Sequence, residues 1–234
     1  MIKAVTFDLD DTLWDVRPAL VQAEEAQNRW LNTHFPDALA DMDHDALMAR
    51  KRQLIKDQPE LIHNISLFRK QFITQLLLRA GESLEDARAG AEGAFAEFIA
   101  RRHHVALFEH AEPVLEKLAI RYTLGALTNG NADVFKTPLA PYFQFALKAE
   151  DVGAAKPDAA MFELAMKLAE VDADELVHVG DSHDHDIIGA HRLGIASVWL
   201  APTNDDGTLP QSQHASAVIG CLSDLPVVLD GLRA

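Results

Sequence analysis

The chain of 234 residues is predicted to form an α/β fold, a doubly wound parallel sheet with an all-helical domain inserted after its first strand. Short apolar runs typical of buried strands alternate with helical patterns after about residue 105. From Pro18 to about Arg102 the pattern is helical and strand signals are scarce. The apolar run at residues 2–7 indicates a strand with no partner nearby in the sequence, so it is expected to join the later strands.

The inserted segment is expected to contain about four helices. Pro18 suits the first turn of one helix, and the stretch DHDALMARKRQLIKD is typical of another. A third is indicated by apolar residues at helical spacing, namely Ile65, Phe68, Phe72 and Leu76. Gly81 is expected to end this helix, and Ser83 with Asp86 to begin the next as a capping box. The stretch DQPELIHN is expected to be a loop.

The rest of the chain alternates between helices and strands. In order, the predicted elements are the helix EPVLEKLA, the strand YTLGALTNG, the short strand QFALKAE, the helix KPDAAMFELAMKLAE, the strand DELVHVGDS, the helix DIIGAHRLG, the strands IASVWL and SAVIG, and a helix from Ser223. We therefore expect a core made of residues 1–14 and 106–234 and a helical insertion made of residues 15–105. Ligands of such sheets bind beyond the carboxyl ends of the strands, where the insertion would act as a lid.

The composition argues against several classes of partner. The formal net charge is −15, from 21 basic and 36 acidic residues, which disfavours binding to nucleic acid or to an anionic membrane surface. No run approaches the roughly 18 apolar residues of a membrane span. The first residues lack the charged segment and long apolar core of a secretory signal, so a cytoplasmic protein is expected. The single cysteine, Cys221, allows no intrachain disulfide and is interpreted as a small apolar filler.

Polar residues gather at the carboxyl ends of four predicted elements. They are Asp8, Asp10, Asp11 and Thr12 after the first strand, Thr128, Asn129, Gly130 and Asn131 after the second, Lys156 after the third, and Gly180, Asp181, Ser182, Asp184 and Asp186 after the strand ELVHV. Each group alone can be an ordinary turn. Together at one edge of a sheet, several acids, a lysine and a Thr-Asn-Gly turn favour a site for Mg²⁺ and a phosphate. A bound cation would also offset the repulsion between crowded carboxylates.

In this order, the stretches DLDDTL, TNG, the pair Lys156-Pro157 and GDSHDHD resemble the four motifs of the haloacid dehalogenase superfamily. The resemblance covers the whole chain and implies a Rossmann-like core with a helical cap at residues 15–105. Because it has a second aspartate, Asp10, the chain resembles the magnesium-dependent phosphatases of the superfamily. The dehalogenases proper lack this residue. The stretch DLDDTLWDVRPAL, with TNGN later, is similar to the flavin mononucleotide (FMN) phosphatase subgroup, which acts on FMN and on the phosphorylated ribityl-pyrimidine precursor of riboflavin.

The resemblance implies a role for each acid of the first motif. Asp8 would be the nucleophile, which attacks phosphorus and forms an aspartyl-phosphate. Asp10 would be the general acid for the leaving alkoxide and then the general base for water. Mg²⁺ would be held by the side chains of Asp8 and Asp181 and by the backbone carbonyl of Asp10. Asp11 has no assigned role and is expected to brace the loop or the hinge to the cap.

The resemblance also implies how the phosphoryl group would be held. Thr128 and the amides of Asn129 and Gly130 would bind its oxygens. Lys156 would add a positive charge and pair with Asp8. Asp186 would be either a water-mediated ligand of the metal or the partner of Lys156.

Two features of the motifs leave alternatives open. His185 stands where the family often has asparagine, and with His183 it is either a polar loop or part of a transition-metal site. Trp14 either packs at the hinge or stacks on a flat substrate ring.

The sequence therefore predicts a magnesium-dependent phosphomonoesterase acting on a small phosphorylated metabolite, FMN or a riboflavin-pathway phosphate among them. The alternatives are a phosphotransferase or mutase that uses the same aspartyl-phosphate, a nucleotide or sugar-phosphate phosphatase, and a binding protein without catalysis.

Overall fold

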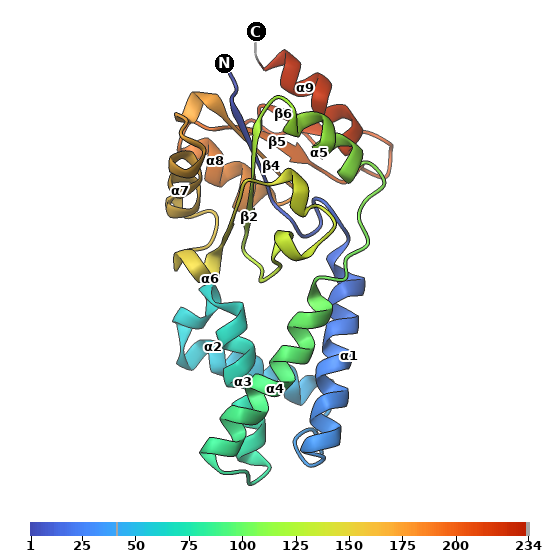
Figure 1. The fold of residues 1–234 in the computed structure, drawn as a ribbon, viewed down its shortest axis with the longest axis vertical. Helices are drawn as coiled ribbons and strands as arrows, with labels where there is room; N and C mark the ends of the chain where they lie inside the picture. Colours follow the sequence, from blue (N-terminus) through green and yellow to red (C-terminus); the bar gives the residue numbers. More distant parts are fainter. Residues whose placement is uncertain (41, 233–234) are drawn as a thin grey trace. The chain divides into compact units, whose positions relative to one another are not determined.

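The computed structural model describes residues 1–40 and 42–232, and the chain divides into two compact units (Figure 1). The first unit comprises Met1–Val16 and Val105–Ala234, and the second comprises Arg17–His104. The first unit contains a six-stranded sheet in the order β3-β2-β1-β4-β5-β6, in which every pair is parallel. The expected doubly wound α/β fold is confirmed.

The first strand lies at the centre of the sheet. Its bounds are Ala4–Phe7, and it pairs with β2 (Thr123–Thr128) on one side and β4 (Leu176–Gly180) on the other. All four of its residues are buried, which explains why its sequence shows no alternation of apolar and charged residues. The edge strands are β3 (Phe145–Lys148) and β6 (Ala217–Ile219), and β5 (Ala196–Leu200) lies between β4 and β6.

Helices cover both faces of this sheet (Figure 1). One apolar core joins the strands to α5 (Ala111–Ala119) and α9 (Leu225–Gly231) through residues such as Leu115 and Leu229. The other core joins them to α7 (Ala159–Ala169) and α8 (Ile188–Arg192), with Phe162 buried at its centre. The remaining short elements of this unit are α6 (Ala149–Val152), a π-helical turn at His183–Ile187 and 3₁₀ turns at Val134–Lys136, Ala140–Tyr142, Ala173–Glu175 and Leu222–Asp224. The helix expected from Ser223 thus begins as a 3₁₀ turn before α9.

The second unit is helical, as expected from the period of its apolar residues. It consists of α1 (Val16–His34), α2 (His44–Asp57), α3 (Ile65–Arg79) and α4 (Leu84–Arg102). Ser83 caps α4 by accepting a hydrogen bond from the amide of Asp86, and Gly81 follows α3 with the positive φ that glycine tolerates. The segment expected as a loop contains a 3₁₀ helix at Pro59–His63, which begins with proline.

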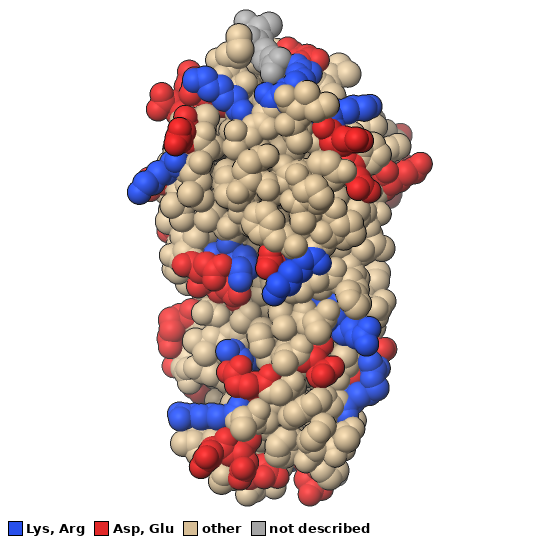
Figure 2. Space-filling model, viewed as in Figure 1, with Lys and Arg blue, Asp and Glu red and all other residues tan. Residues whose placement is uncertain are grey.

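The chain leaves and re-enters the first unit at one place. Trp14 forms bridges with Asp10 and with Leu107, and the amide of Phe108 donates to the carbonyl of Leu13. These contacts tie the end of the first motif to the returning chain. Among the described residues, no helix combines the length and apolarity that crossing a membrane requires. Lys and Arg side chains are interspersed with Asp and Glu on the face drawn in Figure 2.

Candidate active site

The site residues expected from the sequence line a single pocket of about 320 Å³ in the first unit. They are Asp8, Asp10, Thr128, Asn129, Gly130, Lys156, Asp181 and Asp186. They come from the loops after β1, β2 and β4 and from the segment before α7, because the carboxyl ends of parallel strands meet at one edge of the sheet. Ser182 and His185 also line this pocket, and no role for Ser182 is predicted from the motifs.

Lys156 is buried and is held by three acceptors. Its Nζ lies 2.7 Å from Asp8 Oδ1, 2.7 Å from Asp186 Oδ1 and 2.6 Å from the carbonyl oxygen of Leu127. These contacts use all three N–H donors of the ammonium group. The Asn129 side chain positions the lysine's backbone by accepting from its amide (2.8 Å) and donating to its carbonyl (2.9 Å). Lys156 is therefore fixed from both ends.

Asp186 belongs to a buried polar chain that the motifs do not predict. Its Oδ1 also accepts from His178 Nε2 (3.0 Å), and its Oδ2 accepts from the amide of Ser182 (3.0 Å). The other ring nitrogen of His178 lies 2.9 Å from the hydroxyl of Thr6, its neighbour across the pairing of β1 with β4. The sequence does contain a signal for this polar chain, because Thr6 and His178 are polar residues within two otherwise apolar strands. Of the two alternatives for Asp186, the structure contains the pair with Lys156.

Glycine is required beside this carboxylate. A Cβ atom at Gly180 would lie 2.3 Å from the carboxyl carbon of Asp186, closer than real Cβ contacts. The last residue of β4 therefore leaves the space that Asp186 occupies.

The pocket holds more negative than positive charge. Burial raises the pKa of Asp8, with Asp186 and Asp181 adding to the effect and Lys156 opposing it. Burial and the charge of Asp186 also raise the pKa of Asp181. Asp186 is different, because the charge of Lys156 and the hydrogen bond from His178 outweigh burial and hold its pKa well below the usual range. Burial disfavours the ammonium of Lys156, but Asp186 and Asp8 together raise its pKa.

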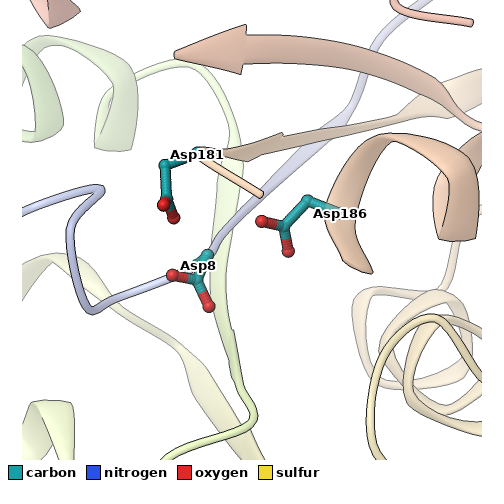
Figure 3. Close-up of side chains that lie close together, drawn as sticks. All are labelled: Asp8, Asp181 and Asp186. Carbon is teal, nitrogen blue, oxygen red and sulfur yellow. The ribbon is translucent and has the colours of Figure 1, made fainter. Parts of the chain in front are cut away.

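This donor set fits a hard divalent cation. One carboxylate oxygen from each of Asp8, Asp181 and Asp186 lies within 4.8 Å of the others (Figure 3). Mg²⁺ and Ca²⁺ prefer oxygen ligands of this kind. Both oxygens of Asp186 accept hydrogen bonds of 2.7–3.0 Å, whereas the contact of Asp8 Oδ2 with Thr12 is longer, at 3.4 Å, so Asp8 and Asp181 are the better donors. Thr12 Oγ1 lies 3.1 Å from Asp181 Oδ1 and 3.4 Å from Asp8 Oδ2, between the two side chains.

The other two acids of the first motif have separate surroundings. Asp10 Oδ1 accepts from the indole N–H of Trp14 at 2.8 Å, and the indole is fully buried. Trp14 therefore packs in the core, which is one of the two alternatives for it. Asp11 adopts a positive φ of 58°, and its carboxylate accepts from the amide of Val16 at the start of α1. Asp11 thus braces the loop where α1 begins.

The Thr-Asn-Gly turn is closed by a hydrogen bond of its own. The amide of Gly130 donates to Thr128 Oγ1 at 3.0 Å, and Thr128 is buried. The binding of phosphoryl oxygens by this turn stays a prediction.

The histidines of the last motif have local partners. His183 packs edge-on against Trp199 and lies within 2.9 Å of the hydroxyl of Ser212, while His185 lies 3.2 Å from that of Ser182. In the described part of the chain, these histidines form no group of three or more ligands with metal-binding spacing. The contacts of His183 and His185 with Trp199, Ser212 and Ser182 are those of a polar loop.

At the carboxyl edge of this doubly wound sheet, a lysine and several acids surround a pocket that fits a cation. This arrangement is typical of a class of α/β enzymes. Residues 2–194 match the family model of haloacid dehalogenase-like hydrolases, and the chain belongs to that family. It is therefore a hydrolase.

Known relatives and structures are similar over most of their length. The chain is 36% identical to the 5-amino-6-(5-phospho-D-ribitylamino)uracil phosphatase YigB of Escherichia coli, over 88% of this chain and 86% of the relative. It is 28% identical to the glyceraldehyde 3-phosphate phosphatase of Methanopyrus kandleri, over 88% and 90% of the two chains. A crystal structure named 2-haloacid dehalogenase, from Pseudomonas syringae pv. Tomato DC3000, superposes with a TM-score of 0.90 at 42% identity and covers 99% of both chains.

Proposed function

We propose that the protein is a phosphomonoesterase that hydrolyses a small phosphorylated metabolite with Mg²⁺ as its cation. The observation that carries this proposal is Asp10, a second carboxylate that lines the pocket of Asp8 and is held by the indole of Trp14. An alkoxide leaves a phosphate ester poorly unless an acid protonates it, whereas a halide leaves carbon without a proton. A positioned second acid therefore favours phosphate esters over haloacids as substrates.

In this proposal Asp8 forms the new bond to phosphorus while the bond from phosphorus to the leaving oxygen breaks. Asp10 gives its proton to the leaving alcohol, then accepts a proton from the water that hydrolyses the aspartyl-phosphate. Asp8 is thereby regenerated and inorganic phosphate leaves. The side chains of Asp8 and Asp181 and the carbonyl of Asp10 would hold Mg²⁺, which would supply positive charge to offset that of the phosphoryl group.

The remaining residues hold this arrangement. Thr128, Asn129 and Gly130 bind phosphoryl oxygens, with Gly130 allowing a close approach of the backbone. Lys156 orients Asp8 and offsets its charge, and Asp186 fixes Lys156. Residues 1–14 and 106–234 form the catalytic core in this proposal, and residues 15–105 form the cap.

The substrate class we propose is a riboflavin-pathway phosphate or FMN. It is supported by the similarity to the Escherichia coli ribitylaminouracil phosphatase. The test is a phosphate-release screen with and without Mg²⁺ over FMN, the phosphorylated ribitylaminouracil, glyceraldehyde 3-phosphate, phosphoserine and nucleoside monophosphates, beside halide release from 2-chloropropionate. We expect phosphate release that a chelator abolishes. Equal rates over the panel would contradict the flavin-pathway substrate, and halide release without phosphate release would overturn the phosphatase.

Mg²⁺ is expected to stabilise the protein more at about pH 8 than at about pH 5. The pKa of Asp8 is raised in the folded protein, so proton binding to Asp8 stabilises the fold when no cation is bound. This stabilisation is lost as the pH rises through the native pKa of Asp8. Protons also compete with the cation, so its affinity rises by up to about tenfold per pH unit while one proton is displaced. Thermal unfolding with and without Mg²⁺ at each pH measures the effect. An equal shift of the midpoint at both pH values would contradict it.

Trp14→Phe is expected to lower kcat by about 10–100-fold, because a hydrogen bond to a charged group contributes about 1.5–3 kcal/mol. The variant keeps an aromatic ring but loses the N–H that holds Asp10. The loss should be larger for an alkyl phosphate than for p-nitrophenyl phosphate, whose leaving group needs less protonation. Trp30→Phe, in the helical unit, is the matched control. Equal losses for the two substrates would assign Trp14 a role in packing alone.

A further inference from the structure

The helical unit contains a cavity of its own. It has a volume of about 270 Å³ and lies between α1, α2 and α3. Leu31, Leu47, Phe68 and Leu76 contribute apolar walls. This volume is far above the roughly 10–15 Å³ that one water molecule needs and just below the roughly 300–1,000 Å³ of sites for drug-sized ligands. The cavity therefore has the size of a site for a small organic molecule.

The polar side chains of this cavity carry an excess of positive charge. Lys51 and Arg69 line it together with one acid, Glu24. Arg69 is only 16% exposed, and its terminal N–H groups reach Glu24 at 3.4 Å and Gln27 at 3.2 Å. Its Nε–H is buried and has no acceptor among the described residues. Two cations thus share one carboxylate in a chain whose net charge is −15.

Among the described residues, the second cation, Lys51, has no carboxylate at ion-pair distance. Lys51 Nζ lies 5.5 Å from the ring centre of Phe72, and burial lowers the pKa of the lysine, with Arg69 adding to the effect and Glu24 opposing it. An anion in the cavity would supply a negative partner for the ammonium of Lys51, and the apolar walls would bury the rest of the ligand.

We propose that this cavity binds a small organic anion with an apolar body, of the class of aromatic or short-chain carboxylates. The site goes beyond the proposed phosphatase activity, because its lining residues belong to the helical unit alone and come from α1, α2, α3 and the segment that joins α1 to α2. The ligand is either a free anion or the anionic part of a larger substrate.

The test uses the full chain without Mg²⁺, so that the acidic pocket of the first unit repels anions. Benzoate is titrated by calorimetry and by the amide shifts of an NMR spectrum, with benzyl alcohol and benzylamine as neutral and cationic counterparts. We expect benzoate to bind at least about tenfold more tightly than either counterpart. We also expect shifts clustered on α1, α2 and α3. Equal binding of benzyl alcohol, or shifts confined to the first unit, would overturn the proposal.

Matched variants locate the charge and the cavity. Lys51→Gln should weaken benzoate binding about tenfold, whereas Arg52→Gln, an exposed neighbour on the same helix outside the cavity, should leave it unchanged. Leu47→Trp should weaken binding by filling the cavity while keeping both cations. Unchanged affinity in both Lys51→Gln and Leu47→Trp would also overturn the site, and thermal unfolding confirms that each variant is folded.

A last titration separates the two sources of the ligand. With chelator present to prevent turnover, the best substrate of the phosphate screen is added before benzoate. Mutual displacement assigns the site to the anionic part of the substrate, and simultaneous binding assigns it to a separate anion. Either result requires benzoate to bind in this cavity and so supports the site.

Discussion

Asp8→Asn is expected to lower kcat by at least about a thousandfold, because an amide cannot act as the nucleophile that Asp8 is proposed to be. The same change removes one of the two carboxylates that contact Lys156, and Lys156 keeps its contact with Asp186. The variant should therefore fold normally. Without Mg²⁺ its unfolding midpoint should equal or exceed that of the natural chain, since repulsion in the pocket falls.

The measurements are steady-state phosphate release, thermal unfolding and Mg²⁺ affinity. Asp184→Asn is the matched control, because Asp184 is exposed in the loop of Asp181 and does not line the pocket. Mg²⁺ should bind more weakly to Asp8→Asn than to this control, since one oxygen donor has lost its charge. Near-normal turnover in Asp8→Asn would remove the covalent mechanism, whatever the metal affinity.

Much of the pocket was predictable because of how parallel sheets are built. Strands of one direction bring their carboxyl ends to one edge, so polar residues that follow separate strands converge without any knowledge of their distances. Asp8, Asp181 and Lys156 lie together for this reason. The membership of β1 in the sheet followed from the same logic, since a lone parallel strand needs partners from later in the chain, whereas its central place is a finding of the structure.

The polar chain behind the pocket was not predictable in the same way. The contact of His178 with Thr6 depends on the register of β4 against β1, and that register follows from packing of the whole sheet. The indole of Trp14 reaches Asp10, four residues earlier, because the loop turns back and brings the two residues into a bridge. The first case depends on contacts between residues far apart in sequence and the second on the conformation of a turn, and a pattern read along one strand contains neither.

Lys156→Met is expected to destabilise the protein by about 3–5 kcal/mol as well as to abolish activity, because it leaves buried carboxylates without their cation. For a chain of this size the unfolding midpoint should fall by roughly 6–20 °C. Asp186 sets the pH dependence of this effect, because its pKa is lowered in the folded protein. At pH values above the usual pKa of an aspartate, its pairing with Lys156 stabilises the fold, and this stabilisation is lost as the pH falls through the native pKa. The difference in stability between variant and natural chain should therefore shrink at acid pH.

The control is Lys148→Met, which removes a half-buried lysine that pairs with Glu150 and Asp151 in the same unit and should cost below about 1 kcal/mol. A double variant, Lys156→Met with Asp186→Leu, removes the buried charge together with its partner and should recover part of the lost stability. Recovery of stability without activity would mean that Lys156 acts on Asp8 in the reaction as well as neutralising Asp186 in the fold. If the single variant is as stable as Lys148→Met, the buried pair does not hold the pocket together and the proposed role of Asp186 fails.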